Sequence, residues 1–233
     1  MCNSTMDDGD GKYGSRYFID GPTYGKYRSQ LDAETQLGKW YCALVKHLRR
    51  RGIDLSEAPS PVVEVGCGYG PLLAALHRVG ASCIGTDLSL FALEAIRQTH
   101  DSWPLVACDL ASLPFGSGTG GTLVACEVLE HLESPQNALR EMRRVVSSGG
   151  LVIVTSPNPL GDILPLANSN LDPTHISVLR PQQWERRFMA AGFSQARAVT
   201  GYQVPYLWKF SEALSKIVPL PVVGPATVLV ARP

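Results

Sequence analysis

The stretch that decides the fold is Val63-Glu64-Val65-Gly66-Cys67-Gly68-Tyr69-Gly70. A short apolar run, 62–65, leads into it, and a helical pattern over 71–79 follows it with Pro71 at the first helical position. Glycines at alternate positions allow the backbone to approach a ligand closely. In an open α/β sheet, such a loop lies in the crevice at the carboxyl ends of the strands. We therefore expect a ligand site at this turn.

Apolar runs and helical segments alternate through the rest of the chain. The predicted strands are 62–65, 82–86, 105–108, 123–126, 151–155, 195–200 and 226–231. The predicted helices start near residue 31 and at 71, 89, 134 and 181, each ending close to a glycine or at residue 100. This alternation indicates βαβ units. We predict an α/β, doubly wound, Rossmann-like and mostly parallel seven-stranded sheet with helices on both faces.

Two segments depart from this regular pattern. Residues 1–30 are polar and glycine-rich, with tyrosines and Phe18 but neither helical nor strand periodicity, and we interpret them as a flexible lid. With the helix that follows, they would form an N-terminal helical and aromatic cover. Residues 31–233 are expected to form a single domain, in which 156–180 is an irregular acceptor-site insertion. An aromatic segment, 202–210, and a short helix to about Ile217 precede the last strand.

Composition narrows the class of protein. Lysine plus arginine (21) equals aspartate plus glutamate (21), and the pI is near 6.9, which makes nucleic acid an unlikely partner. The six cysteines form no C-x-x-C pair, as expected for buried thiols in a reducing cytosol. We expect no signal peptide and no transmembrane segment, since lysine, proline and glycine interrupt the apolar stretch 214–230. A cytoplasmic protein is therefore predicted, with peripheral membrane contact through 206–208 and 217–223 as a possibility.

The glycine loop differs from a dinucleotide-binding fingerprint. The pattern here is G-x-G-x-G, and Pro71 stands where G-x-G-x-x-G has its third glycine. Glu64, two residues ahead of Gly66, would repel a pyrophosphate but attract an ammonium group. This charge favours a zwitterionic or cationic nucleotide ligand over NAD.

Residues 60–156 resemble the class I S-adenosylmethionine-dependent methyltransferases, in particular their small-molecule, type 11-like subgroup. The motifs that carry the resemblance are E-V-G-C-G-x-G at 64–70, D-L-S at 87–89, D-L-x-x-L-P-F at 109–115 and E-V-L-E-H-L at 127–132. One departure is Gly120-Gly121-Thr122, where family members often have an aspartate before the fourth strand. The resemblance implies S-adenosylmethionine as the cofactor and S-adenosylhomocysteine as its product.

The resemblance also implies roles for individual residues. Glu64 would lie near the amino group of the cofactor, and Asp87 would accept hydrogen bonds from both ribose hydroxyls. Asp109 would face the adenine amino group. The full set of implied cofactor-binding residues is Glu64, Gly66, Gly68, Gly70, Asp87, Leu88, Asp109, Leu110 and Glu127.

Candidates for the group that activates the methyl acceptor lie in Glu127-Val128-Leu129-Glu130-His131. If the chain turns helical here, Glu127, Glu130 and His131 share one face. With His175 from the Asp172–His175 segment they offer two oxygens and two nitrogens to a divalent metal such as Mg²⁺. This pattern is similar to magnesium-dependent methyltransferases of RNA 3′ ends and to ubiquinone-pathway O-methyltransferases. In the metal-free alternative, His131 or His175 is the catalytic general base. His47, His77 and His100 are interpreted as ordinary polar surface.

The predicted function is methyl transfer to oxygen or nitrogen of a small-molecule acceptor, which we expect to be a biosynthetic intermediate or a natural product. Aromatic residues in the cover and in 202–210 suggest a pocket for a flat or apolar molecule. A metal-dependent O-methyltransferase of a quinone precursor or RNA 3′ end is the alternative enzyme. A non-catalytic nucleotide-binding module is the alternative from another class.

Overall fold

The computed structural model describes residues 12–21, 24–159, 172–203, 217–219 and 226–233. They form one eight-stranded sheet in the order β3-β2-β1-β4-β5-β8-β6-β7. The strands are β1 (Val62–Val65), β2 (Cys83–Asp87), β3 (Leu105–Ala107), β4 (Gly120–Cys126), β5 (Val146–Pro157), β6 (Gln195–Gln203), β7 (Ile217–Pro219) and β8 (Ala226–Arg232). The first five in this order pair in parallel, and β8, β6 and β7 pair antiparallel. The doubly wound prediction is confirmed, with β7 as one strand more than expected.

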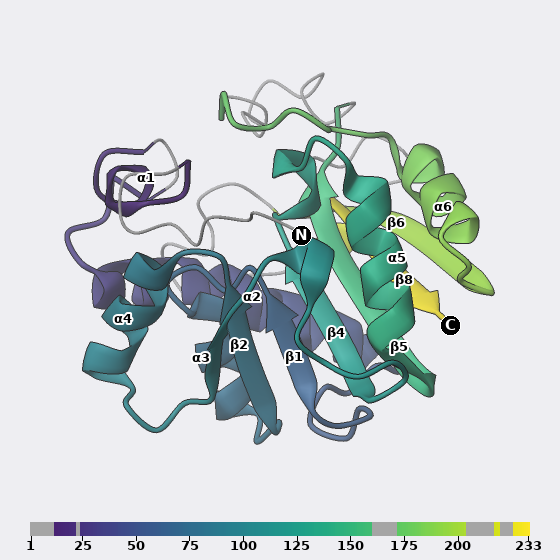
Figure 1. Ribbon diagram of the computed structural model, residues 1–233, viewed down its shortest axis with the longest axis horizontal. Helices are drawn as coiled ribbons and strands as arrows, with labels where there is room; N and C mark the ends of the chain where they lie inside the picture. Colours follow the sequence, from purple (N-terminus) through teal and green to yellow (C-terminus); the bar gives the residue numbers. More distant parts are fainter. Residues whose placement is uncertain (1–11, 22–23, 160–171, 204–216, 220–225) are drawn as a thin grey trace.

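Helices cover both faces of the sheet (Figure 1). They are α1 (Ser15–Ile19), α2 (Gln30–Arg50), α3 (Pro71–Arg78), α4 (Leu90–Thr99), α5 (Pro135–Val145) and α6 (Pro181–Ala190), with short 3₁₀ helices η1 (Leu110–Ser112) and η2 (Leu129–His131). Helices α2, α3 and α4 contribute to the core on one face, and α5 and α6 contribute to the core on the other.

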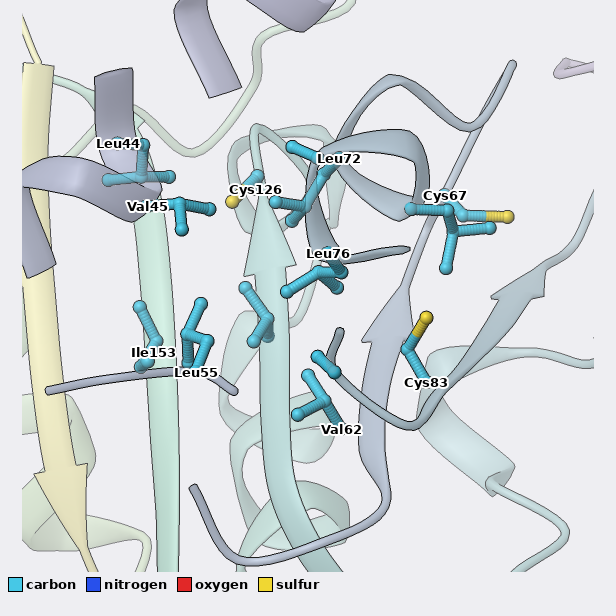
Figure 2. Packing of buried hydrophobic residues seen from close by; sticks show 14 of the residues in the cluster. Leu44, Val45, Leu55, Val62, Cys67, Leu72, Leu76, Cys83, Cys126 and Ile153 are labelled. Carbon is cyan, nitrogen blue, oxygen red and sulfur yellow. The ribbon is translucent and has the colours of Figure 1, made fainter. Parts of the chain in front are cut away.

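Alternation along each strand divides the core between these two faces. Val62 of β1 packs with Leu72 and Leu76 of α3, as Figure 2 shows, whereas its neighbour Val63 belongs to the cluster under α5. Successive side chains of a strand point to opposite faces, so a strand buried on both sides is apolar throughout. All four residues of β1 are buried, including Glu64 at 2% exposure. Glu64 is the one ionisable residue in this strand.

The N-terminal cover is more ordered than its composition predicts. Residues 15–19 form helix α1, and Phe18 is 4% exposed. Its ring centroid lies 4.8 Å from those of Tyr24 and Tyr69, which places the cover on the glycine loop. A five-residue helix is too short to show a 3.6-residue period, and aromatic packing rather than periodicity holds it. Residues 1–11 and 22–23 of the predicted lid lie outside the described residues.

Two smaller predictions need correction. His77 is exposed as expected, whereas His47 is 7% exposed and His100 is half-buried. The rings of His77 and His100 both stack on Trp103, with centroids 4.5 and 3.7 Å away. His100 Nε2 also lies 2.7 Å from a Glu34 carboxylate oxygen. A large aromatic neighbour in the loop after α4 explains the half-buried position of His100, and helical periodicity does not reveal it.

The Gly120-Gly121 pair belongs to β4 instead of preceding it. A Cβ on Gly121 would lie 2.2 Å from the carbonyl oxygen of Pro59, so the backbones approach too closely for any side chain. This close approach explains why an aspartate is absent here. Among the described residues, Cys42, Cys67, Cys83, Cys108 and Cys126 are buried free thiols, as expected.

No described helix combines the length and apolarity that a membrane span requires. Several predicted features lie outside the described part of the chain. They are residues 204–210 of the aromatic segment, the helix before Ile217, the proposed membrane patch at 206–208 and residues 160–171 of the insertion.

Candidate active site

The glycine loop passes from β1 into α3 through left-handed backbone. Gly66, Gly68 and Gly70 have φ values of 72°, 51° and 79°, and Gly70 caps the N-terminus of α3. A Cβ on Gly66 would lie 2.5 Å from Val128, and one on Gly68 would lie 2.3 Å from the Tyr24 hydroxyl. Both the dihedral angles and these neighbours therefore require glycine.

Glu64 lies directly beneath this loop. Its Oε2 has no hydrogen-bond partner among the residues that the structure describes. Burial, together with the nearby charge of Asp87, raises the pKa of Glu64 well above its ordinary value. A buried carboxyl group without a partner is costly, and a bound ammonium group would both pair with it and favour its ionised form.

Asp87, at the end of β2, fixes the loop. Its Oδ2 accepts a hydrogen bond from the Gly68 amide at 2.7 Å, and its Oδ1 accepts one from the Ser89 amide at 2.8 Å. Burial nevertheless raises the pKa of Asp87. Each carboxylate oxygen has a second lone pair, so these amide bonds leave acceptor capacity toward the cavity.

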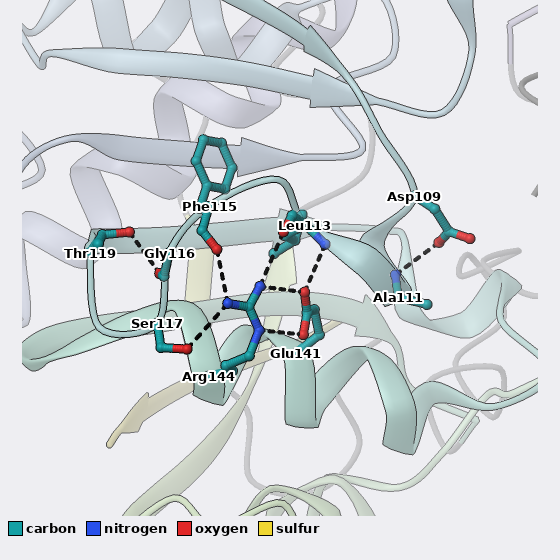
Figure 3. A network of polar contacts seen from close by, with 9 residues as sticks. All are labelled: Asp109, Ala111, Leu113, Phe115, Gly116, Ser117, Thr119, Glu141 and Arg144. Atoms are coloured by element: carbon teal, nitrogen blue, oxygen red, sulfur yellow. Dashed lines mark hydrogen bonds and ion pairs between the residues drawn. The ribbon is translucent and has the colours of Figure 1, made fainter. Parts of the chain in front are cut away.

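Asp109, at the end of β3, caps η1 by accepting a hydrogen bond from the Ala111 amide at 2.8 Å. The loop behind it is braced by α5, as Figure 3 shows. Glu141 accepts a hydrogen bond from the Leu113 amide at 2.8 Å and pairs with Arg144 at 2.6 Å. Arg144 also donates to the carbonyl oxygens of Leu113 and Phe115. This network holds the loop against α5.

A cavity of about 120 Å³ opens at these strand ends. Its walls combine loop residues, strand-end carboxylates and aromatic residues of the cover: Tyr13, Tyr17, Phe18, Tyr24, Val65, Gly66, Gly68, Asp87, Leu88, Cys108, Asp109, Leu110, Glu127, Val128, His131 and Leu132. Seven of the nine predicted cofactor residues are thus brought together. Glu64 does not line this cavity, and Gly70 faces Ile96 and Trp103.

A second cavity, of about 380 Å³, shares walls with the first at Gly66, Glu127, His131, Tyr17 and Tyr24. Its other walls come from α2, from the strand ends and from the 172–175 segment: Leu37, Trp40, Tyr41, Cys67, Cys126, Pro157, His175 and Ala226. The lining of this cavity therefore combines aromatic rings with the carboxyl group of Glu127 and two imidazoles.

The segment after β4 does not form the expected helical face. Glu127 has a φ of 56°, and it is the sole residue other than glycine with positive φ in the described part of the chain. Its carboxylate accepts a hydrogen bond from Thr155 at 2.9 Å. Only Leu129–His131 is helical, as η2, so Glu127 lies outside the turn that carries Glu130 and His131. Positive φ in a β-unbranched acidic residue is uncommon and is often found at functional sites.

Glu130 is fully buried, and neither of its carboxylate oxygens has a hydrogen-bond partner among the described side chains and backbone groups. Burial and the neighbouring Glu127 raise the pKa of Glu130 well above its ordinary value. Glu130 is therefore part of the interior of the protein and not of its surface. Its own carbonyl oxygen accepts the amides of Ile176 and Ser177, both at 2.8 Å, which ties the 172–177 segment to η2.

His131 and His175 both line the second cavity, and their rings are in edge contact with centroids 4.7 Å apart. Burial lowers the pKa of His131 to about 4, and burial also lowers the pKa of His175. Both imidazoles are therefore neutral at pH 7 and able to accept a proton or bind a metal. Ligand atoms of Glu130, His131 and His175 lie within 4.8 Å of one another, and Glu127 is not part of this cluster.

Sequence reasoning missed two contributors to this site. The hydroxyl of Thr174 lies 2.9 Å from His131 Nδ1, and Thr155 holds Glu127. The Asp172-Pro173-Thr174-His175 segment was noted for His175 alone, although a hydroxyl two residues from an aspartate was a signal for a local hydrogen bond. Nothing in the sequence predicted the contact of Thr174 with a residue 43 positions away.

Comparisons with known proteins agree with this geometry. Residues 63–154 match the family model described as a methyltransferase domain. Over this segment the chain is similar to S-adenosylmethionine-dependent methyltransferases. The expected resemblance is confirmed over the segment that carries the glycine loop and the three strand-end motifs.

Individual relatives share only part of their length with this chain. It is 27% identical over 132 residues to a probable S-adenosylmethionine-dependent methyltransferase of Mycobacterium tuberculosis, which covers 57% of this chain and 48% of that protein. It is 34% identical to the ubiquinone biosynthesis O-methyltransferase of Thiobacillus denitrificans, over 49% and 52% of the two chains. The chain thus spans about half the length of the curated relatives that it matches.

A solved structure extends the likeness in fold. A methyltransferase from Thermotoga maritima, described as a possible histamine N-methyltransferase, superposes with a TM-score of 0.65 at 17% identity. The match covers 85% of this chain and 93% of that one.

Proposed function

We propose that this protein transfers the methyl group of S-adenosylmethionine to an oxygen or nitrogen of a small-molecule acceptor. The observation that carries the proposal is the pair of cavities that share Gly66, Glu127 and His131. The first would hold the cofactor, and the second would bring the acceptor to the same wall. Methyl transfer is an in-line displacement that requires this alignment above all.

The residues of the first cavity fit the cofactor. Oε2 of Glu64, which has no partner among the described residues, suits the cofactor amino group, and the remaining acceptor capacity of Asp87 suits the ribose hydroxyls. One oxygen of Asp109 caps η1, which leaves the other for the adenine amino group. The glycines give a wall without side chains on which the methionine part would lie.

The second cavity supports a flat acceptor with a proton to lose. Tyr17, Trp40 and Tyr41 supply aromatic surface to its lining, and His131 and His175 supply imidazoles. A neutral imidazole would remove the proton of a phenol or an amine during transfer. The five buried thiols support a reducing, cytoplasmic location.

The test is methyl transfer from S-adenosylmethionine labelled in its methyl group to phenol, catechol and aniline derivatives. We expect label in at least one compound, with His131→Ala and His175→Ala each lowering kcat by tenfold or more, which corresponds to about 1.4 kcal/mol of barrier. Binding of S-adenosylhomocysteine without transfer to any acceptor would instead support a non-catalytic nucleotide-binding module. Failure to bind S-adenosylhomocysteine at all would overturn the proposal.

A metal-dependent O-methyltransferase of a quinone precursor or an RNA 3′ end is the second candidate. The approach of Glu130, His131 and His175 within 4.8 Å favours it, and their oxygen and nitrogen atoms suit Mg²⁺ or a borderline divalent ion. Such an ion would hold the acceptor hydroxyl and lower its pKa.

Chelation separates the two candidates. If a metal takes part, EDTA abolishes transfer to catechol and added Mg²⁺ restores it, and Glu130→Gln mimics the chelator. If a histidine acts as the base alone, EDTA leaves the rate unchanged. The metal candidate is rejected by full activity in EDTA-treated protein.

A further inference from the structure

We infer that Thr174 and Asp172 fix the tautomer of His131, with the proton on Nδ1 and the lone pair on Nε2. The catalytic consequence of this tautomer rests on the proposed function, because a base or a metal ligand must present a lone pair. The tautomer itself rests on geometry alone. Neither Thr174 nor Asp172 lines either cavity, so both would act as positioning residues.

Three hydrogen bonds make the direction unambiguous. The Thr174 hydroxyl lies 2.5 Å from Asp172 Oδ1 and 2.9 Å from His131 Nδ1. A hydroxyl has one proton, and an ionised carboxylate can only accept. The Thr174 proton is therefore donated to Asp172, and the hydroxyl oxygen accepts the proton of His131 Nδ1. The Thr174 amide donates to the same Asp172 oxygen at 2.9 Å, which holds the carboxylate in place.

The hydrogen-bonded chain of Asp172, Thr174 and His131, here called the relay, is held rigid by the surrounding backbone. Glu130, next to His131, accepts the amides of Ile176 and Ser177, and the Ser177 hydroxyl donates to the Leu132 carbonyl oxygen at 2.7 Å. These bonds fasten the 172–177 segment on both sides of His131. His175 differs, because its buried Nδ1 has no partner among the described residues. The relay therefore distinguishes the two histidines and assigns the defined lone pair to His131.

The functional consequence follows from the shape of imidazole. A neutral ring has one donor nitrogen and one acceptor nitrogen, and the partner of the first sets the identity of the second. Occupation of Nδ1–H by Thr174 leaves Nε2 as the acceptor on the opposite side of a ring that lines both cavities. Without the relay, a fraction of the molecules would carry the proton on Nε2 and present a donor to the acceptor instead.

The test reads the tautomer directly by ¹⁵N NMR of the histidine side chains at pH 7, in EDTA-treated protein without cofactor or acceptor. We expect His131 Nδ1 to have the chemical shift of a protonated nitrogen and Nε2 that of an unprotonated one. The Nδ1–H form should outweigh the other by about tenfold, as expected for one hydrogen bond that is linked to a charged group. A predominant Nε2–H form would overturn the inference.

Variants make the assignment specific. Thr174→Val removes the hydroxyl with little change in shape and should give a mixture of tautomers, whereas Thr174→Ser should keep the Nδ1–H form. Asp172→Ala frees the hydroxyl to donate to Nδ1 and should shift His131 toward Nε2–H. Ser177→Ala is the matched control. It removes a hydroxyl bond of the same segment but keeps the amide bonds of Ile176 and Ser177 to Glu130, so it should leave the tautomer unchanged.

Unchanged His131 shifts in folded Thr174→Val protein would also refute the inference. The result does not depend on catalysis. A tautomer that responds as expected in a protein without methyl transfer would count against the proposed function alone. In an active enzyme, Thr174→Val should lower kcat for the methylated phenol or amine by about tenfold with little change in KM, and Thr174→Ser should restore it.

Discussion

At the scale of single residues, Glu64 is expected to have opposite effects on the stability of the folded protein and on cofactor binding. Its carboxyl group is 2% exposed, and Oε2 has no partner in the described part of the chain. Because burial raises the pKa of Glu64, its ionised form destabilises the folded protein at pH 7. Glu64→Gln removes this charge, so the free energy of unfolding should stay equal or rise.

The same variant should bind S-adenosylhomocysteine at least tenfold more weakly, because the amide cannot pair with the cofactor ammonium group. Isothermal titration calorimetry measures this change. Methylthioadenosine, which lacks the amino acid part, is the control ligand and should bind both proteins equally. Equal weakening for the two ligands would show that Glu64 supports the loop rather than the amino group.

At the scale of elements, the loop after β3 depends on α5. Glu141 accepts hydrogen bonds from the Leu113 amide and from Arg144, and those bonds lower its pKa. Because the pKa of folded Glu141 lies below its ordinary value of 4.5, its contribution to stability is complete above pH 4.5 and is lost as the pH falls through the lowered pKa.

Glu141→Gln should therefore destabilise the protein by about 1 kcal/mol at pH 7, with allowance for partial solvent exposure of the pair. The difference from the unaltered protein should shrink below pH 4.5. Urea unfolding at a series of pH values measures it. Arg140→Gln, on the exposed side of the same helix, is the matched control and should change stability by less than about 0.5 kcal/mol. A pH-independent difference would exclude the carboxylate as the cause.

The cover is the second element whose role can be tested. With Tyr17, Phe18 and Tyr24 in place, the first cavity measures about 120 Å³, which is smaller than the roughly 300 Å³ at the lower end for ligand pockets. We therefore predict that residues 1–30 act as a lid that rearranges when the cofactor binds.

Trypsin can cleave this segment at Lys12, Arg16, Lys26 and Arg28. Saturating S-adenosylhomocysteine should slow these cuts by severalfold, as measured by mass spectrometry, because the segment would close over the ligand. Cleavage after Arg50 and Arg51, at the end of α2, is the control in the same digest and should keep its rate. Equal rates at all sites would show that the segment does not respond to the cofactor.

At the scale of the whole molecule, the chain order of the sheet places the site. Strands β1 and β4 are neighbours although β2 and β3 lie between them in sequence, and the strand order reverses at this pair. The loops after β1 and β4 diverge there and leave a crevice at the carboxyl ends. The glycine loop follows one strand and Glu127 follows the other, so the switch point brings Gly66 and Glu127 to the same cavity walls.

What the sequence determined by itself is local or periodic. The sequence predicted the β1–α3 turn, the strand-end carboxylates Asp87 and Asp109 and the alternation of strands and helices. Each of these features depends on residues within a few positions of one another. Periodicity failed for α1, which is too short to show one, and for η2, where a single left-handed residue, Glu127, ends the expected helical face.

Only the tertiary structure decided what depends on distant partners. The burial of Glu130 depends on the fold around it. The contact of His100 with Glu34 and the bond between Thr174 and His131 join segments whose separation in sequence carries no pattern. The pKa of His131 and the tautomer that we infer for it follow from desolvation and from one hydroxyl 43 residues away. The sequence determined which groups reach the crevice, whereas packing determined which of them carry a proton there, because protonation depends on the surroundings of a group and not on its neighbours along the chain.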